Sequence, residues 1–497
     1  MLQSCCRLAP RLLPRRCRPL WRAHSLPAVA PPLATTFPYG LTGATATEAH
    51  YSTALDLALP LLLRSSSRDF MAAAREDAGS ERVEGYLARA SSACDAFLDS
   101  EVVHGREEVR RELLGVLRQR GQLALLLGGA SVGKSLLLRE LARAPTVGKD
   151  GVLRVVVLVN GRGSGADLAG GVVRALQKVT LEGALGGALQ GAGRSAADCE
   201  RHTQVLEGLR EAVKVAAPAL FSGLHLTPGA ADTERMLDAM CDLARREGAY
   251  VCLVIDEGNL ALPSPPQPGE ALGEGASSSE QQRQLRDTKS LLNRLVMLTK
   301  ESRRMNVLIA TSEHAYPYRL QHGNFFNTTN LTRTILAGEL PPARMRELLR
   351  SWGLGPRTSD VFLAYLGGHV HLASQALDRL AATLDAFDVL EVAPSLCAVS
   401  VDTCLREGGS SARGLLRALA QAGWAPVEGP QEAAVQVLAR ENVGGLVDQS
   451  AVVVGLPAAL RRSAAGGLGA VPSFHFLRHV IAHRLSVADR LQGLASP

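Results

Sequence analysis

The residues Gly128 to Ser135 have the types and spacing of a loop that binds phosphate. Their sequence, GGASVGKS, matches the pattern G-x-x-x-x-G-K-[ST] in full. Glycines let the backbone wrap a phosphate with its N–H groups turned inward, and a helix that starts near Lys134 adds its positive N-terminal end. We expect Lys134 to reach the outer phosphates of a nucleoside triphosphate and Ser135 to place its hydroxyl on Mg²⁺. The predicted phosphate contacts are Gly128, Gly129, Ala130, Ser131, Val132, Gly133, Lys134, Ser135 and Leu136.

A second set of reactive side chains follows the wholly apolar run from Val251 to Ile255. Such a run is typical of a buried strand, and Asp256 and Glu257 stand directly at its end. Downstream of a phosphate-binding loop, this arrangement predicts that Asp256 holds Mg²⁺, mainly through water. Glu257 is then expected to act as the general base that polarises the attacking water.

A weaker third signal is the strand Val307 to Ala310, which ends in Thr311 and Ser312. In nucleotide switches of this kind, a polar residue on the strand between those of the first two motifs contacts the γ-phosphate or the water. Thr311 and Ser312 are therefore candidate catalytic residues. An ordinary cap at the end of the strand explains the same two residues equally well.

The elements around these motifs alternate between short apolar runs and helical patterns, which predicts a doubly wound parallel sheet of the α/β class. Beyond the sheet we expect a helical lid and a C-terminal unit that is helical or winged-helix-like, with a strand pair at 445–447 and 451–454. The predicted strands are Leu123–Leu127, Val152–Val159, Val251–Ile255, Val307–Ala310 and one that begins at Thr334–Leu336. The predicted organisation is a targeting presequence at 1–47, a helical segment at 48–100, a P-loop core at 101–340, a lid at 341–400 and a C-terminal unit at 401–497.

The distribution of charge separates the N-terminus from the rest of the chain. The formal net charge is +6, and residues 1–47 contain six arginines but no lysine, aspartate or glutamate. An Arg-rich, acid-free start predicts a mitochondrial presequence, with a plastid as the alternative. The remainder is formally neutral, which argues against a general electrostatic grip on nucleic acid.

Several further stretches resemble the AAA+/STAND group of ATPases, in particular the archaeal-type ATPase family. They are the GRE of Gly105 to Glu107, the glycine loop, the VIDE strand, the helix leading into VLIATSEH, and the GELPPARMRELLRSWG segment. The resemblance covers roughly residues 100–390. It implies that Gly105 and Arg106 lie near the adenine base. The proline of the lid's usual GxP turn is missing from the corresponding stretch, Gly367 to His371.

The remaining features limit the kinds of site to be expected. No guanine-reading N/TKxD motif is present, so ATP is favoured over GTP. The cysteines show no CxxC spacing and the histidines no HExxH, which argues against a zinc site, and no apolar run is long enough to predict a transmembrane segment. Candidate arginine fingers are Arg303, Arg304, Arg319 and Arg333.

Three functions fit these observations. The first is an ATP-driven switch that acts on a macromolecular partner, most simply a protein, either as a monomer or as an oligomer. The second is a recruitment module that binds nucleotide and hydrolyses it slowly or not at all. The third is an organelle DNA-binding ATPase similar to origin-recognition proteins, which the neutral charge after residue 47 disfavours.

Overall fold

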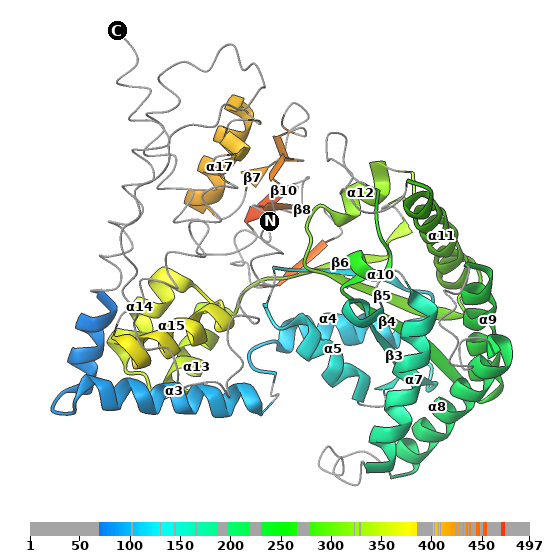
Figure 1. Ribbon diagram of the computed structural model, residues 1–497, viewed down its shortest axis with the longest axis horizontal. Helices are drawn as coiled ribbons and strands as arrows, with labels where there is room; N and C mark the ends of the chain where they lie inside the picture. Colours follow the sequence, from blue (N-terminus) through cyan, green and yellow to red (C-terminus); the bar gives the residue numbers. More distant parts are fainter. Residues whose placement is uncertain are drawn as a thin grey trace, which may run out of the picture.

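The computed structural model describes most of residues 69–384 and short parts of the C-terminal region (Figure 1). Gaps in the first range are 101–102, 130, 144–145, 165–166, 186–195, 219–229, 266–277, 323 and 328–329. Beyond residue 400, the described parts are 401, 403–405, 407, 409–422, 425–426, 431, 434–435, 437–438, 444–447, 451–454 and 469–472. The predicted presequence lies outside the described residues. Most of the low-complexity stretch at 183–197 and of the Pro/Gly/Ser stretch at 262–280 also lies outside them.

A mostly parallel sheet forms the centre of the larger unit. Among the described residues, seven strands pair in the order β2-β3-β4-β5-β1-β6-β9, and β2 alone of these runs antiparallel to its neighbour. In that order the strands are Thr146–Val147, Leu153–Asn160, Ala249–Asp256, Met305–Thr311, Leu123–Leu127, Arg333–Ala337 and Ala451–Val454. The predicted parallel α/β sheet is confirmed, with the five predicted apolar runs as β3, β4, β5, β1 and β6.

The central strands are apolar throughout because their side chains alternate between two covered faces. In β1, Leu123, Leu125 and Leu127 enter one core, while Ala124 and Leu126 enter the other. Helices α7 (Leu168–Leu185), α8 (Ala196–Ala216), α9 (Ala230–Arg246) and α11 (Ser278–Val296) contribute to the first core. Helices α4 (Glu107–Arg118) and α5 (Lys134–Arg143) contribute to the second. The result is a three-layer sandwich whose parallel strands all deliver their carboxyl ends to one edge.

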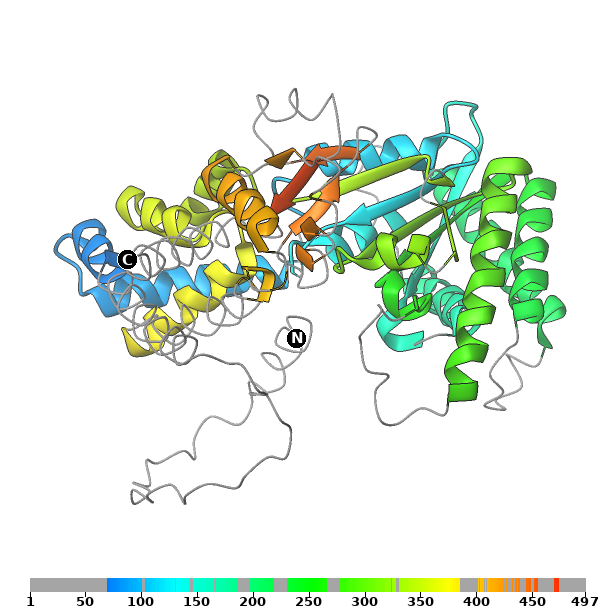
Figure 2. The same ribbon diagram turned by 90° about the horizontal axis from the view of Figure 1, so that it is seen from above.

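A separate helical unit lies beside the sheet, as the two views in Figures 1 and 2 show. Its helices are α13 (Pro342–Ser351), α14 (Pro356–Leu366) and α15 (Val370–Thr383), which follow β6, and α3 (Val83–Asp99), which precedes the sheet. Helix α3 packs against α15, and Tyr86 and Leu87 share one apolar core with Trp352 and Phe362. The chain therefore enters the sheet from this unit and returns to it through residues 338–341.

The C-terminal strands differ from the pair that the sequence predicts. Strand β8 (Gly444–Val447) belongs to a small antiparallel sheet with β7 (Ala425–Pro426) and β10 (Gly469–Pro472), next to helix α17 (Gly409–Ala422). Strand β9 instead extends the large sheet by pairing in parallel with β6. The predicted pairing of 445–447 with 451–454 is therefore wrong, because β6 offers an open edge to the second of these apolar segments.

In the part of the chain that the structure describes, no helix combines the length and the apolar character needed to cross a membrane.

Candidate functional site

The glycine loop joins the end of β1 to the start of α5, so the predicted strand–loop–helix context is present. At Gly128 the backbone presses against the end of β6, since an added Cβ would lie 2.4 Å from the carbonyl oxygen of Ala337. Two positions have a positive φ, Ser131 at 61° and Gly133 at 91°. Ala130 lies outside the described residues. The loop is thus bent sharply enough to turn successive backbone amides toward a ligand at the start of α5.

Lys134 is buried at the first position of α5, with 7% of its surface exposed. Its Nζ donates hydrogen bonds to the carbonyl oxygens of Gly128 and Gly129, each at 2.8 Å. Burial lowers the pKa of Lys134 to about 8, opposed by the negative charges of Glu257 and Asp256. A buried ammonium group bonded only to two neutral carbonyls would be stabilised strongly by an anionic ligand, because the ligand adds an opposite charge. This geometry therefore fits a phosphate-binding lysine.

Asp256, the last residue of β4, is brought to the glycine loop by the parallel sheet. Its carboxylate accepts a hydrogen bond from the Ser135 side chain, and burial raises the pKa of Asp256. The same carboxylate accepts the Glu257 N–H through Oδ1 at 3.1 Å. A hydroxyl and a carboxylate in direct contact, beside a phosphate-binding loop, are the oxygen donors that Mg²⁺ takes when it also binds nucleotide phosphates. The donor set therefore fits the metal that the sequence predicts.

Glu257 lies on a tight turn between β4 and the short helix α10 (Gly258–Ala261). Its backbone is left-handed, with φ 53° and ψ 53°, an uncommon conformation for a residue other than glycine. Its Oε1 accepts a hydrogen bond from Arg162 Nη2 at 2.5 Å, and its Oε2 accepts one from Ser312 Oγ at 3.4 Å. The predicted general base is thus buried and held between the segments that follow β3 and β5, namely Arg162 of α6 and Ser312. The strained turn positions its carboxylate beside Asp256.

The third predicted pair, Thr311 and Ser312, is divided between two environments. Strand β5 does lie between β1 and β4, as expected. Thr311 Oγ1 donates to Asn259 Oδ1 at 3.0 Å and accepts the Glu313 N–H at 3.1 Å, which is the bonding of a strand cap. Ser312 instead contacts Glu257. Of the two, Ser312 is better placed to act with the general base.

Two residues near the motifs were not singled out by sequence. Arg162 follows β3 closely, in the short helix α6 (Gly161–Ser164), and the approach of β3 to β4 explains its contact with Glu257. His314 is buried, and burial together with the charge of Lys134 lowers its pKa to about 4. An imidazole near the phosphate-binding lysine is therefore neutral at physiological pH. Neither residue's place near the site has a local sequence signature, because it depends on the pairing of strands that are distant in sequence.

Gly105 and Arg106 were predicted to lie near the adenine base, and that role stays a prediction. In the structure the Arg106 guanidinium is buried and donates to two backbone carbonyls, of Val132 and of Gly338. Gly105 has φ 65°, and an added Cβ would lie 3.0 Å from a methyl group of Leu340. The GRE segment is thus packed between the glycine loop and the link that follows β6.

The other side chains considered at the sequence level have structural partners. His369 caps α15 by accepting the Leu372 N–H on Nδ1 at 3.2 Å. Among the described residues, no group of three or more His, Cys, Asp or Glu side chains could hold a metal ion. Of the candidate arginine fingers, Arg304, Arg319 and Arg333 each form ion pairs with carboxylates of this chain. Arg303 is exposed, and its carbonyl accepts a hydrogen bond from the Tyr250 hydroxyl.

Comparisons with known proteins give only distant structural similarities. No protein-family model matches the chain, and no curated protein matches it. Among solved structures, the chain is similar to a Walker-type ATPase of Pyrococcus abyssi, at 16% identity and a TM-score of 0.42, covering 76% of this chain and 96% of that chain. It is also similar to the ORC1 protein of Aeropyrum pernix in complex with DNA, at 14% identity and a TM-score of 0.32, covering 79% and 95%.

A third similarity is to the ORC2 protein of Aeropyrum pernix, solved as ADPNP–ADP complexes. The sequence identity is 10% and the TM-score 0.32, with 78% of this chain and 95% of that chain covered. At these TM-scores the structural overlap carries no argument about function. The interpretation of the site therefore rests on the residues of this chain.

Proposed function

We propose that this chain is a P-loop ATPase of the AAA+/STAND type, which binds ATP with Mg²⁺ and uses its hydrolysis as a conformational switch. The observation that carries the proposal is the contact between the Ser135 hydroxyl and the Asp256 carboxylate, with Lys134 buried beside them. The two motifs are far apart in sequence, and chance pairing does not explain why the predicted metal donors meet at the start of the loop helix. ATP is favoured over GTP because the sequence has no guanine-reading motif.

Each residue has a defined role in this proposal. The loop amides and Lys134 bind the phosphates, and Ser135 and Asp256 would hold Mg²⁺. When bound, the metal supplies charge neutralisation on the phosphate oxygens. Glu257 orients the attacking water and accepts its proton, while the bond between the γ-phosphorus and the bridging oxygen breaks to give ADP and inorganic phosphate. Ser312 contacts Glu257 and keeps the carboxylate oriented.

The switch requires a part that moves in response to the site. The helical unit of α3 and α13–α15 has its own apolar core and continues directly from β6, whose end contacts the glycine loop at Gly128. A separately packed unit beside a ligand site is the usual mobile part of such proteins. We propose that its position depends on the bound nucleotide and is read by a protein partner.

Hydrolysis of ATP by the full chain tests this function. We expect Mg²⁺-dependent release of phosphate from the wild type, loss of ATP binding in Lys134→Ala, and binding without turnover in Glu257→Gln. Glu211→Gln, an exposed carboxylate on α8, is the matched control and should behave like the wild type. A folded wild type that binds no ATP, measured by calorimetry, would remove the proposal.

One observation favours the second candidate, a switch that hydrolyses slowly. The Arg162 guanidinium holds Glu257 at 2.5 Å, and the carboxylate must leave this ion pair before it can accept a proton from water. Arg162→Ala should then raise the turnover rate several-fold. Arg235→Ala, which removes a surface ion pair on α9, is the control and should not change it. A lower rate in Arg162→Ala would show instead that Arg162 assists catalysis.

We also propose that residues 1–47 direct the chain to mitochondria, from their arginine-rich and acid-free composition. Fusion of these residues to a fluorescent protein tests this proposal. Diffuse fluorescence would contradict it, and plastid fluorescence in plant cells would support the alternative.

A further inference from the structure

Arg106 is a buried charge placed between the nucleotide site and the helical unit. It immediately precedes α4, and 8% of its surface is exposed. Burial lowers its pKa to about 10, opposed by the charge of Glu339, so the guanidinium remains protonated at physiological pH. A buried cation must keep its hydrogen-bond acceptors, because an unmatched buried charge is strongly unfavourable.

The acceptors of Arg106 come from two different parts of the molecule. Nη2 donates to the carbonyl oxygen of Val132, in the glycine loop, at 2.5 Å. Nη1 donates to the carbonyl oxygen of Gly338, in the link after β6, at 2.6 Å. The planar guanidinium presents its two terminal nitrogens in a fixed geometry, so the two carbonyls are held in a defined relation to each other.

The link is fastened in turn to the helical unit. The Leu340 N–H donates to the Gly368 carbonyl at 3.0 Å, and the Gly368 N–H donates to Glu339 Oε2 at 3.0 Å. The two segments approach so closely that a Cβ on Gly368 would lie 1.9 Å from the Leu340 carbonyl oxygen. A displacement of the link at residues 338–340 must therefore displace the turn at residue 368.

That turn leads into the packed helices of the helical unit. His369 caps α15, and α15 packs against α3 in the apolar core of the helical unit. A continuous series of hydrogen bonds thus leads from the glycine loop through Arg106 to the link, and from the link to α15. Because close-packed interiors transmit displacement and do not absorb it, movement at one end of this series is passed to the other.

We propose that Arg106 is a positioning residue that couples the conformation of the glycine loop to the position of the helical unit. The coupling rests on the proposed function, because ATP supplies the change at the loop. In the structure, Lys134 donates to the carbonyls of Gly128 and Gly129 in the loop. When ATP binds, the Lys134 ammonium group donates to a phosphate in place of these carbonyls. The loop carbonyls then rearrange, and Arg106 follows Val132 and moves the link with it.

Hydrogen exchange tests this coupling without labels on the chain. Exchange at the amides of Leu340 and Gly368 is measured in the full chain, with and without Mg²⁺ and a non-hydrolysable ATP analogue, and analogue affinity is measured by calorimetry. In the wild type, the analogue should change the exchange rates of both amides roughly tenfold. In Arg106→Gln and Arg106→Lys, this nucleotide-dependent change should be lost, while the affinity for the analogue falls much less than in Lys134→Ala.

Arg110→Gln is the matched control, since Arg110 lies on α4, the helix that directly follows Arg106, and forms an exposed ion pair with Glu140. It should keep the wild-type response. If Arg106→Gln does not fold, Arg106→Lys carries the test, because lysine keeps the charge without the two-armed geometry. The coupling is overturned if either folded variant keeps the full response at Leu340 and Gly368.

Two other outcomes also decide the question. A wild type that binds the analogue without any change at the link overturns the coupling and leaves the proposed ATP binding intact. A loss of affinity in Arg106→Lys as large as that in Lys134→Ala overturns it in favour of direct nucleotide contact. Failure of the wild type to bind nucleotide is recognised separately, by calorimetry, as failure of the proposed function.

Discussion

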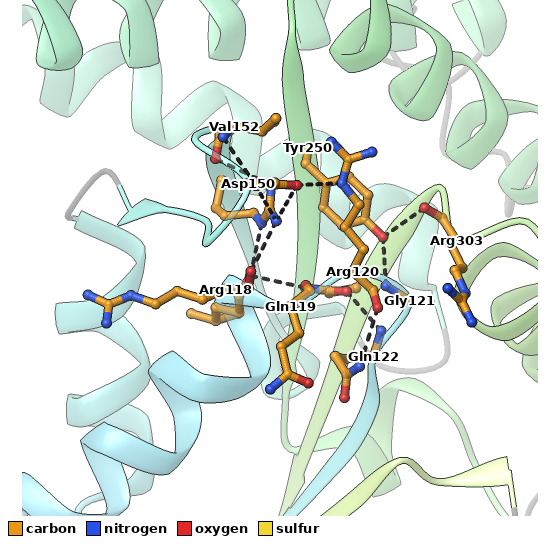
Figure 3. A network of polar contacts seen from close by, with 12 residues as sticks. Arg118, Gln119, Arg120, Gly121, Gln122, Asp150, Val152, Tyr250 and Arg303 are labelled. Atoms are coloured by element: carbon orange, nitrogen blue, oxygen red, sulfur yellow. Dashed lines mark hydrogen bonds and ion pairs between the residues drawn. The ribbon is translucent and has the colours of Figure 1, made fainter.

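The two ends of the central sheet both bury charged residues, but they use them differently. At the amino ends of the strands, a network that includes Arg154 links β3, β4 and the loops beside them. Figure 3 shows Asp150 and Tyr250 within it. At the carboxyl ends, Lys134, Asp256 and Glu257 gather around the glycine loop. The first group supports the fold, and the second comprises the residues that we propose bind Mg²⁺ and nucleotide.

The amino-end network matches each buried donor with an acceptor of the chain itself. Arg154 is fully buried, donates to the carbonyl oxygens of Leu117 and Arg118 and to the Asp150 carboxylate, and lies 4.7 Å from the centre of the Tyr250 ring. The Tyr250 hydroxyl accepts the Gly121 N–H at 2.9 Å. These bonds close the C-terminal end of α4 onto the sheet.

The carboxyl-end group is held by contacts that a ligand would replace. Lys134 donates to a carbonyl of the glycine loop, and we expect it to leave that carbonyl when a phosphate binds. Glu257 is held by Arg162. Ser131 and Glu257 have left-handed backbones, but so has Arg303, whose carbonyl accepts the Tyr250 hydroxyl in the Arg154 network, so backbone strain does not distinguish the two ends. What distinguishes the two ends is the kind of partner: groups of the chain that a ligand could replace at the carboxyl end, and fully paired buried groups at the amino end.

The largest effect should come from breaking the amino-end network. Arg154→Ala removes a fully buried guanidinium together with its hydrogen bonds to three backbone carbonyls and to Asp150. We expect a loss of about 3 to 5 kcal/mol in the free energy of unfolding. Arg120→Ala removes an exposed partner of the same Asp150 carboxylate and should cost less than about 1 kcal/mol. Denaturant midpoints compare the two variants. Equal losses of stability in the two variants would show that the burial of Arg154 does not determine its contribution to the free energy of unfolding.

A second effect distinguishes the buried lysine of the site from an ordinary cation. Because burial lowers the pKa of Lys134 to about 8, the free protein loses this charge as the pH rises above that value. Bound phosphate favours the protonated form, so ATP binding should take up a proton, and affinity should fall about tenfold per pH unit above about pH 8. Calorimetry in buffers of different ionisation enthalpy measures this uptake.

The matched variant for this pH dependence is Lys134→Arg. A guanidinium stays protonated throughout this range, so the remaining affinity of the variant, whatever its level, should not vary with pH above about 8. Wild-type binding without proton uptake would contradict the assignment of Lys134 as the group that titrates.

The sequence predicts the parts of this site that depend on local pattern. Strands β1 and β4 are uninterrupted apolar runs, and the loop and carboxylates follow them directly, so a parallel sheet had to bring Ser135 and Asp256 together. Arg162 and Arg106 carry no such pattern. Their partners, Glu257 and the carbonyls of Val132 and Gly338, are defined by the approach of segments that are distant in sequence.

The same distinction applies to the fold. The helices of the lid region follow from their apolar spacing, but the packing of α3 against α15 depends on contacts across nearly the whole described chain. The strands β8 and β9, separated by residues 448–450, have the spacing of a hairpin. A hairpin is what the local spacing predicts, but β9 pairs with the open edge of β6 instead. Spacing thus identifies the elements but not the edge to which a short strand adds.

The smallest effect concerns two aspartates at opposite ends of the sheet, whose ionised carboxylates should change the free energy of unfolding in opposite directions. At Asp256, burial raises the pKa, so the ionised carboxylate disfavours the folded state at every pH above both pKa values. At Asp150, burial also acts to raise the pKa, but hydrogen bonds from Arg154, Val152 and Arg120 lower it to about 2. Ionised Asp150 therefore stabilises the fold above its unfolded pKa, and this contribution is lost as the pH falls toward about 2.

Replacing each aspartate by asparagine at neutral pH should consequently shift the free energy of unfolding in opposite directions. Asp256→Asn should stabilise the ligand-free chain and raise the Mg²⁺ concentration needed for ATP binding, because it removes a buried charge that serves the metal. Asp150→Asn should destabilise the chain and leave the Mg²⁺ requirement unchanged. Each shift should be about 1 kcal/mol, since Asp150 is partly exposed and its ion pairs are screened. If both variants lose stability, Asp256 belongs to the fold as much as Asp150 does, and the division of the sheet into a structural end and a functional end fails.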